Sequence, residues 1–124
     1  MAKKLRGEEH ELYDTLVACG IAQRRAVQLQ NLATHCEYRC CVVDSQAEAD
    51  LTILTTQTPN GEFEEYYNKT RERGATLCIM SPYLNAERWE GCRKLIEAHS
   101  STTVDNRAYL LIFNNHLPRQ RFKL

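Results

Sequence analysis

Short apolar runs separated by longer amphipathic stretches are the feature of this sequence that most restricts its fold. Each run is flanked by polar or turn-forming residues, and β-branched side chains are frequent in residues 51–56. Runs of this length and composition are typical of buried strands. The nearly unbroken apolar run at residues 75–80 indicates a central strand of a parallel sheet. The predicted strands cover residues 12–19, 38–43, 51–56, 75–80 and 109–113.

The stretches between these runs are predicted to be helices. Residues 21–36 place most of their apolar side chains on one face, which is the pattern of a helix packed against a core. Residues 62–73 are followed by Gly74, which suits the left-handed position after a helix, and residues 85–99 form the third helix. Strands that alternate with helices favour a parallel sheet. We therefore predict an α/β fold of three layers, a flavodoxin-like parallel sheet of four to five strands with helices on both faces.

The length and charge of the chain restrict its organisation. At 124 residues it has the size of one domain, and we expect a flexible segment at residues 1–10, the domain at 11–118 and a polar tail at 119–124. Lysine plus arginine number 16, as do aspartate plus glutamate, so no positive excess favours nucleic acid. No stretch approaches the ~18 apolar residues that span a bilayer, and no apolar segment follows the charged N-terminus as in a signal peptide. We expect a cytoplasmic protein that neither inserts into membranes nor binds nucleic acid.

Cysteines and a nearby histidine provide the candidates for a metal site. Without a signal peptide, the six cysteines are expected to be reduced, and those within apolar runs, such as Cys19 and Cys40, to pack in the core. Cys36, Cys40 and Cys41 follow His35, but the C-x-x-C spacing is missing, and Cys40 and Cys41 should point to opposite faces of a strand. The glycine-rich phosphate-binding motifs are also missing from the sequence. We therefore predict neither a metal nor a cofactor.

Several segments together resemble the Toll/interleukin receptor (TIR) domain, in particular the TIR adaptors that serve Toll-like receptors. Residues 12–19 are similar to its first signature strand, and residues 59–61 (Pro-Asn-Gly) to the turn of its BB loop. Residues 77–84 resemble its strand C, Trp89 and Cys92 resemble the tryptophan and cysteine of its helix C, and residues 109–118 resemble strand D and the loop after it. The resemblance covers nearly the whole chain. It departs from the family in lacking the Arg-Asp pair before the proline and in about ten extra residues at 46–56.

Some TIR domains cleave NAD with a glutamate four residues after that tryptophan, so the resemblance also bears on catalysis. In this chain the position holds Arg93, and a guanidinium cannot replace a carboxylate that stabilises a positive ribosyl centre. The acidic candidates on the same helix are Glu90 and Glu97, and neither has the motif spacing. The resemblance thus implies a TIR domain without enzymatic activity, and we predict no catalytic residue.

The BB loop of TIR domains is an interaction surface, and the equivalent loop is the predicted interaction site of this chain. Proline pre-sets the backbone of a turn and glycine permits a positive φ, so a stiff loop projects from the edge of the sheet. A stiff loop loses little entropy when it docks. The predicted loop consists of Thr58, Pro59, Asn60, Gly61, Glu62 and Phe63. The resemblance implies an adaptor or modulator in innate immune signalling that binds other TIR-like domains, including second copies of itself.

Two other functions fit parts of the sequence. Residues 38–55 and 69–81 resemble a BRCT domain, which would bind phosphopeptides through Thr55, Thr56 and a basic residue of the second helix. A TIR-type NAD hydrolase would instead use a shifted glutamate, Glu97. The strand order separates the first two: a five-stranded parallel sheet that includes residues 109–113 favours TIR, and a four-stranded sheet with residues 51–55 at its centre favours BRCT.

Overall fold

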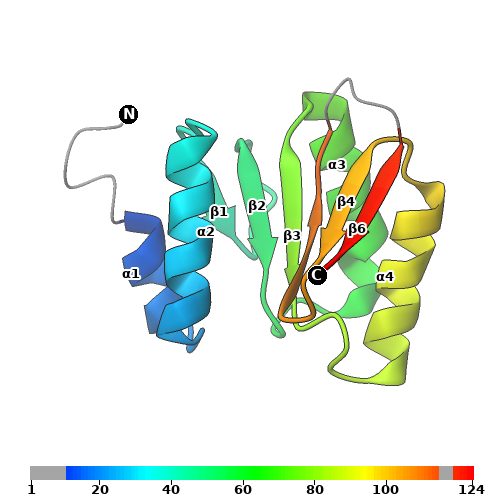
Figure 1. Cartoon of the computed structure of the whole chain (residues 1–124), viewed down its shortest axis with the longest axis horizontal. Coiled ribbons are helices and arrows are strands. Elements are labelled where there is room, and N and C mark those ends of the chain that lie inside the picture. The colour runs from blue at the N-terminus through cyan, green and yellow to red at the C-terminus, as the bar shows by residue number, and fades with distance from the viewer. Residues whose placement is uncertain (1–10, 115–118) are drawn as a thin grey trace.

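The computed structural model describes residues 11–114 and 119–124, which form an α/β fold around a central sheet (Figure 1). The described residues contain four α-helices, α1 (Glu11–Ala18), α2 (Gln23–His35), α3 (Phe63–Arg73) and α4 (Ala86–Ala98), and a 3-10 turn, η2 (Asn60–Glu62). The strands are β1 (Cys41–Val43), β2 (Leu51–Leu54), β3 (Thr76–Met80), β4 (Thr102–Asp105), β5 (Tyr109–Ile112) and β6 (Gln120–Lys123). Within these ranges, no helix is both long and apolar enough to cross a bilayer.

The strands form one mixed sheet in the order β1-β2-β3-β5-β4-β6. β1, β2 and β3 run parallel, β5 is antiparallel to both β3 and β4, and β4 pairs in parallel with β6. The predicted α/β class is confirmed, but the sheet has six strands rather than four to five and is not wholly parallel. The antiparallel direction of β5 relative to β4 follows from the short turn between them, where Arg107 has a φ of 76°. So short a connection joins antiparallel neighbours, because a parallel pair needs a long crossover.

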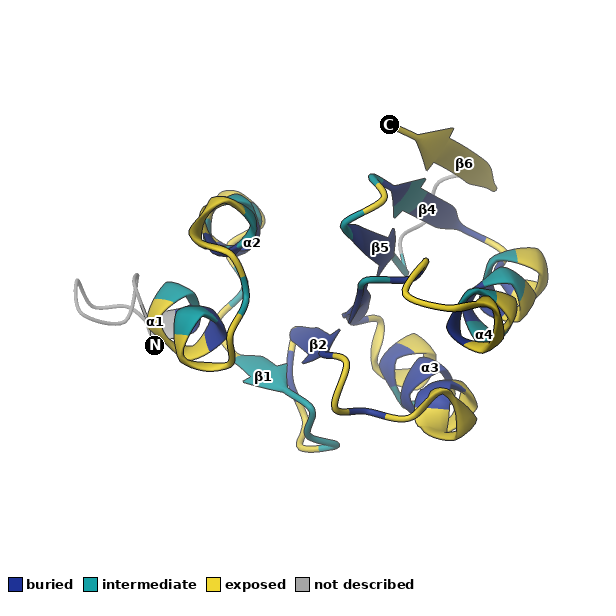
Figure 2. Cartoon of the chain, turned by 90° about the horizontal axis from the view of Figure 1, so that it is seen from below, coloured by how far each residue is buried: buried dark blue, intermediate teal, exposed yellow. Residues whose placement is uncertain are grey.

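Helices cover both faces of the sheet, as predicted, and β3 contributes to the core on each side. Cys78 and Met80 pack in one cluster with α1 and α2, whereas Leu77 and Ile79 pack in the other with α3 and α4. This division follows from the alternation of side chains along a strand. Figure 2 shows the two helix pairs on opposite sides of the strands, with their buried residues facing inward. The three-layer arrangement therefore arises from a central strand that is apolar on both faces.

The prediction of a strand at residues 12–19 is wrong, because these residues form α1 and the start of the turn after it. Leu12 and Leu16 are four positions apart and both buried, as on one face of a helix, while Asp14 and Thr15 are exposed. A short apolar run satisfies helix and strand patterns alike. The strand order does not separate the TIR and BRCT alternatives, since β5 belongs to the sheet and β2 lies inside it.

Two segments that were predicted to be irregular contain strands. Residues 100–107, for which neither a strand nor a helix was predicted, include β4, and the expected tail at 119–124 includes β6. Threonine fits the pleated, half-buried surface of a sheet, so β4 is marked by β-propensity rather than by apolar character. The three predicted helices are confirmed to within about two residues at each end. Gly74 adopts a φ of 70° after α3, as predicted.

His99, at the end of α4, joins three elements of the fold. Its Nδ1 lies 3.0 Å from the hydroxyl of Tyr67 on α3, and its Nε2 lies 2.6 Å from the carbonyl oxygen of Phe113 after β5. A carbonyl only accepts hydrogen bonds, so Nε2 carries the proton and Nδ1 accepts from Tyr67. The His99 side chain is buried, and this burial lowers its pKa because desolvation disfavours the imidazolium.

We expect the domain to lose stability as the pH falls below ~6.5, the ordinary pKa of histidine. Because the folded pKa of His99 is lowered, the unfolded chain takes up a proton that the folded chain resists. The free energy of unfolding should therefore fall from about pH 6.5 down through the folded pKa, with no effect of His99 above that range. Urea denaturation of the His99→Gln variant should show a weaker pH dependence than the exposed-site control His35→Gln. Equal pH dependence in both variants would exclude His99 as the responsible group.

Candidate functional site

The carboxyl ends of the parallel strands meet at one edge of the sheet, where ligand sites of α/β folds usually lie. Asp44 follows β1, Thr55 follows β2 and Ser81 follows β3. Asp44 and Ser81 have φ values of 53° and 52°, a conformation that costs about 1–3 kcal/mol outside glycine and is frequent at functional sites. The polar groups of this edge hold the loop that leads from β2 to α3.

We call residues 55–62 the Pro59 loop. Pro59 is extended, with φ −68° and ψ 148°, and the amide of Glu62 donates to the Pro59 carbonyl at 3.0 Å to form the η2 turn. Residues 59–62 are exposed, whereas Thr58 and Phe63 are 4% and 2% exposed. Of the six residues predicted to contact a partner, the middle four are therefore accessible. The outer two, Thr58 and Phe63, are buried in the domain.

The first anchor of the Pro59 loop is the carboxylate of Asp44. It accepts hydrogen bonds from the amide of Thr55 at 2.8 Å and from the hydroxyls of both Thr55 and Thr58. The Asp44 amide in turn donates to the carbonyl of Ile53 at 2.8 Å, which ties this residue to β2. Charge-assisted hydrogen bonds of this kind are about twice as strong as neutral ones. They fix the start of the loop against the end of β1.

The second anchor is the guanidinium of Arg88 on α4, which is buried beneath the loop. Its Nη1 donates to the Thr58 carbonyl at 3.1 Å, and its Nη2 donates to the carbonyls of Thr55 at 3.1 Å and Met80 at 2.8 Å. Its Nε lies 3.1 Å from the carbonyls of Met80 and Ser81. Desolvation lowers the pKa of Arg88, and the nearby side chains of Cys92 and Asp44 oppose this shift. One side chain thereby connects the first half of the loop, at Thr55 and Thr58, to the end of β3.

Phe63 and Asn60 attach the far end of the loop to α4. The guanidinium carbon of Arg88 lies 5.0 Å from the centre of the Phe63 ring, a cation–π distance. A β-carbon added at Gly91 would lie 3.2 Å from the same ring, so glycine permits this close approach. The side-chain amide of Asn60 donates to the carbonyl of Glu87 at 3.4 Å. The Pro59 loop therefore rests on the first turns of α4.

An aromatic pair lies at the same edge of the sheet, between β3 and α4. The rings of Tyr83 and Trp89 are stacked, with centroids 4.5 Å apart and planes 24° apart. The Tyr83 hydroxyl donates to the carboxylate of Asp105, at the end of β4. Burial, together with this carboxylate, raises the pKa of Tyr83 to about 12, so the hydroxyl remains protonated. Tyr83 and the next residue, Leu84, are 40% and 59% exposed, so this edge carries exposed apolar surface.

The catalytic candidates Glu90 and Glu97 both pair with one cation. Arg93 lies 2.5 Å from a carboxylate oxygen of each, and all three side chains are at least 40% exposed on α4. The hydrogen bond from Arg93 lowers the pKa of Glu90. Acidic residues three and four positions from an arginine lie on the same helical face. The spacing in the sequence therefore already indicates that Glu90 and Glu97 can both pair with Arg93. The structure brings the two glutamates together with Arg93, and not with the Pro59 loop.

Two residues of the BRCT alternative, Thr55 and Lys69, already have partners within the domain. The hydroxyl of Thr55 donates to Asp44, so a phosphate here would meet a carboxylate. Thr56 is exposed, and Lys69 lies 4.0 Å from Glu65 and donates to the side chain of Gln46. Among the residues that the structure describes, no group of three or more histidine, cysteine, aspartate or glutamate side chains is placed to hold a metal.

Sequence reasoning missed Asp44 and Arg88, the two residues that hold the loop. A signal existed for each. Asp44 directly follows an apolar run, and Arg88 is a lone cation on the otherwise apolar face of the predicted third helix, near Cys92 and Leu95. Searches against protein-family models, curated proteins and solved structures found no match to this chain.

Proposed function

We propose that this chain is a cytoplasmic protein-interaction domain without enzymatic activity, an adaptor or modulator in innate immune signalling. It binds TIR-like domains, including second copies of itself, through the Pro59 loop. The observation that carries the proposal is the exposure of residues 59–62 between two buried residues, Thr58 and Phe63. The class of partner comes from the resemblance of this loop to the BB loop of TIR domains.

The anchoring of the loop has a direct consequence for binding. Ordering a flexible side chain at an interface costs about 0.5–1.5 kcal/mol. The hydrogen bonds that Asp44 accepts and Arg88 donates hold the loop backbone before a partner arrives, so the entropy of ordering this backbone is lost during folding rather than on binding. The exposed ring of Tyr83 and the partly buried ring of Trp89 add the residue types that dominate interface energies. The loop and the aromatic pair together suit protein docking.

The arrangement on α4 supports a binding role rather than NAD cleavage. A catalytic glutamate must approach the reacting centre with its carboxylate available. Glu90 and Glu97 are instead both paired with Arg93 on an exposed helical face, and a cation between them would repel a positive ribosyl centre. This geometry favours the interaction function over the shifted-glutamate alternative.

Replacing Pro59 by histidine is expected to weaken partner binding while leaving the melting temperature nearly unchanged. Pro59 is exposed and its backbone is extended, so the new residue meets no steric conflict within the domain but alters the loop surface. We expect an affinity loss of about tenfold, as for a contact worth ~1.4 kcal/mol. Surface plasmon resonance on the immobilised full chain, with the same chain and a TIR domain of a Toll-like receptor adaptor as analytes, measures the change.

The matched control is Asn31→His, an exposed substitution on α2, which covers the opposite face of the sheet from α3 and α4. It should bind like the unaltered chain. Equal affinities for the Pro59 variant and the unaltered chain would rule out the loop as the docking site. An equal loss in both variants would show that histidine acts nonspecifically.

A further inference from the structure

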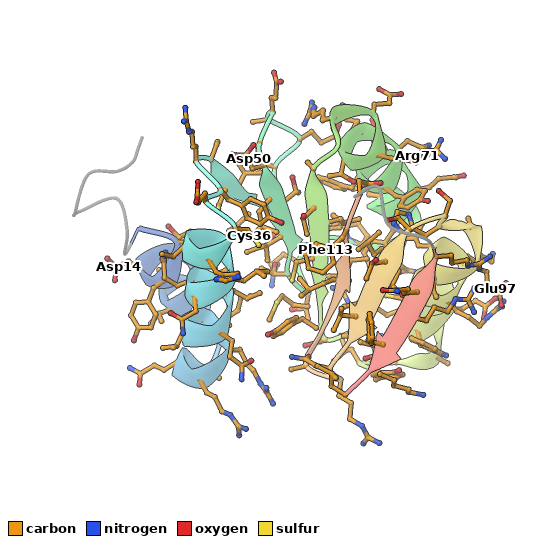
Figure 3. All side chains as sticks on the ribbon, turned by 45° about the horizontal axis from the view of Figure 1, so that its top comes forward. Asp14, Cys36, Asp50, Arg71, Glu97 and Phe113 are labelled. Atoms are coloured by element: carbon orange, nitrogen blue, oxygen red, sulfur yellow. The ribbon has the colours of Figure 1, made fainter. Side chains whose placement is uncertain are left out.

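A second site lies at the opposite edge of the sheet, around the amino ends of β1, β2 and β3. Residues 36–40, 48–50 and 73–75 line a pocket of about 400 Å³, a volume within the range of small-molecule sites. Figure 3 labels two of its residues, Cys36 at the end of α2 and Asp50 before β2. The pocket is separate from the Pro59 loop, which follows the carboxyl end of β2.

The wall formed by residues 36–40 is held in place by backbone hydrogen bonds. The amide of Tyr38 donates to the carbonyl of Ala33 at 2.9 Å, and Glu37 between them has a φ of 58°. The Asp50 carboxylate accepts from the amides of Arg39 at 2.7 Å and Cys40 at 3.1 Å. Exposed free thiols therefore sit on an ordered turn rather than on a loose loop.

Two free thiols, Cys36 and Cys40, line the pocket, and their surroundings differ. The Cys40 thiol donates to the carbonyl of Glu48, with a sulfur–oxygen distance of 3.6 Å. The phenol of Tyr38 lies close to Cys36; burial raises the pKa of Tyr38 to about 12, and Cys36 contributes to that shift. The phenol is therefore protonated at neutral pH, and its oxygen lies 2.5 Å from the hydroxyl oxygen of Thr76. Because the Cys40 thiol is already engaged with a carbonyl, Cys36 is the better candidate of the two for reaction with a disulfide.

The charged residues of the pocket match a zwitterionic ligand. Arg39 and Arg73 provide two guanidinium groups, and Glu37, Glu48 and Asp50 provide carboxylates. The Arg73 guanidinium donates to the carbonyls of Ala47 at 3.3 Å and Gln46 at 3.5 Å. Guanidinium groups recognise carboxylates with good geometry. A small peptide with carboxylates and an ammonium group therefore has groups of opposite charge available in this pocket.

We propose that this pocket is a modification site at which Cys36 forms a mixed disulfide with a small zwitterionic peptide disulfide, of which oxidised glutathione is the representative. The Cys36 thiolate attacks one sulfur of the disulfide, the S–S bond of the reagent breaks, and a new S–S bond to Cys36 forms. One peptide leaves as its thiolate and takes up a proton from solvent. The Cys36 sulfur is oxidised and the released sulfur is reduced, so the exchange balances without another reactant.

The test compares Cys36 with Cys19, an exposed free cysteine that is not among the residues lining the pocket. The folded full chain is treated with oxidised glutathione or with the uncharged bis(2-hydroxyethyl) disulfide, quenched, and mapped by peptide mass spectrometry. Two exposed ion pairs are expected to make glutathione react about fivefold faster at Cys36 than at Cys19. The uncharged disulfide should show no such preference, and Arg73→Gln or Arg39→Gln should reduce it.

The outcomes distinguish recognition of glutathione by the pocket from reaction that depends only on the exposure of a thiol. Equal glutathione reaction at Cys36 and Cys19, or the same preference with the uncharged reagent, would overturn recognition by the pocket. Modification of Cys40 in place of Cys36 would overturn the assignment of the reacting thiol. Because the comparison between the two reagents uses the unaltered chain, it decides the matter even if an arginine variant fails to fold.

Discussion

Replacing Arg88 by methionine is expected to lower the free energy of unfolding by about 3 kcal/mol, because buried carbonyl groups would lose their donor. The Arg88 guanidinium donates to the carbonyls of Thr58 and Met80 at 3.1 and 2.8 Å and is 4% exposed. Methionine fills similar volume, so the loss reports the hydrogen bonds rather than a cavity. Chemical denaturation followed by circular dichroism measures it.

The matched control for Arg88 is the same substitution at Arg93, five positions further along α4. Arg93 is 40% exposed and pairs with Glu90 and Glu97 at the surface. Exposed pairs contribute about 0.2–1 kcal/mol each, so Arg93→Met should change stability far less. A loss at Arg88 no larger than that at Arg93 would contradict its role as the anchor of the Pro59 loop.

Replacing Phe63 by alanine is expected to cost about 3–5 kcal/mol of stability, the usual range for a buried aromatic side chain. Phe63 is 2% exposed, packs in the cluster with α3 and α4, and lies against Gly91 and Arg88. Truncation would leave a cavity beneath the loop and remove the ring that faces the guanidinium. Thermal denaturation should show a lower melting temperature, and urea denaturation a lower midpoint concentration.

Phe122→Ala is the control for Phe63, since Phe122 is 48% exposed on the edge strand β6. We expect it to change stability by ~0.5 kcal/mol or less, as for most surface positions. If Phe63→Ala were as mild as Phe122→Ala and yet abolished partner binding, Phe63 would be a contact residue rather than an anchor. The opposite pattern, an unstable Phe63→Ala beside a stable Pro59→His, fits the division of the loop into anchored ends and exposed middle.

Local patterns account for α2, α3 and α4 and for four strands of this fold, β1, β2, β3 and β5. The helix at residues 62–73 ends at a glycine with a positive φ, and the apolar run of β3 is buried along its whole length. Both features depend on neighbouring residues. Residues 12–19 show where such reasoning fails, because Leu12 and Leu16 suit a helical face as well as a strand. β4 was missed for a related reason, since its buried threonines carry no apolar signal.

The candidate site, like the fold, was only partly predictable from the sequence. The Pro59 turn is readable from proline and glycine alone, and the structure places residues 59–62 at the surface. Its rigidity depends on Asp44 and Arg88, and Arg88 lies 33 positions from its acceptor Thr55. Cys40 of the second pocket and Cys19 were expected to pack in the core, but both are exposed. Burial at the margins of an element is set by packing partners that a linear pattern does not contain.

The sequence by itself determined the alternation of apolar strands and amphipathic helices, and with it the three-layer class and the exposed proline turn. These depend on hydrophobic periodicity and backbone preference within a few consecutive residues. The tertiary structure alone decided the helical state of residues 12–19, the antiparallel direction of β5 and the anchoring of the loop by Arg88. Those outcomes depend on contacts between distant segments, whose free energy is gained only when the whole domain packs.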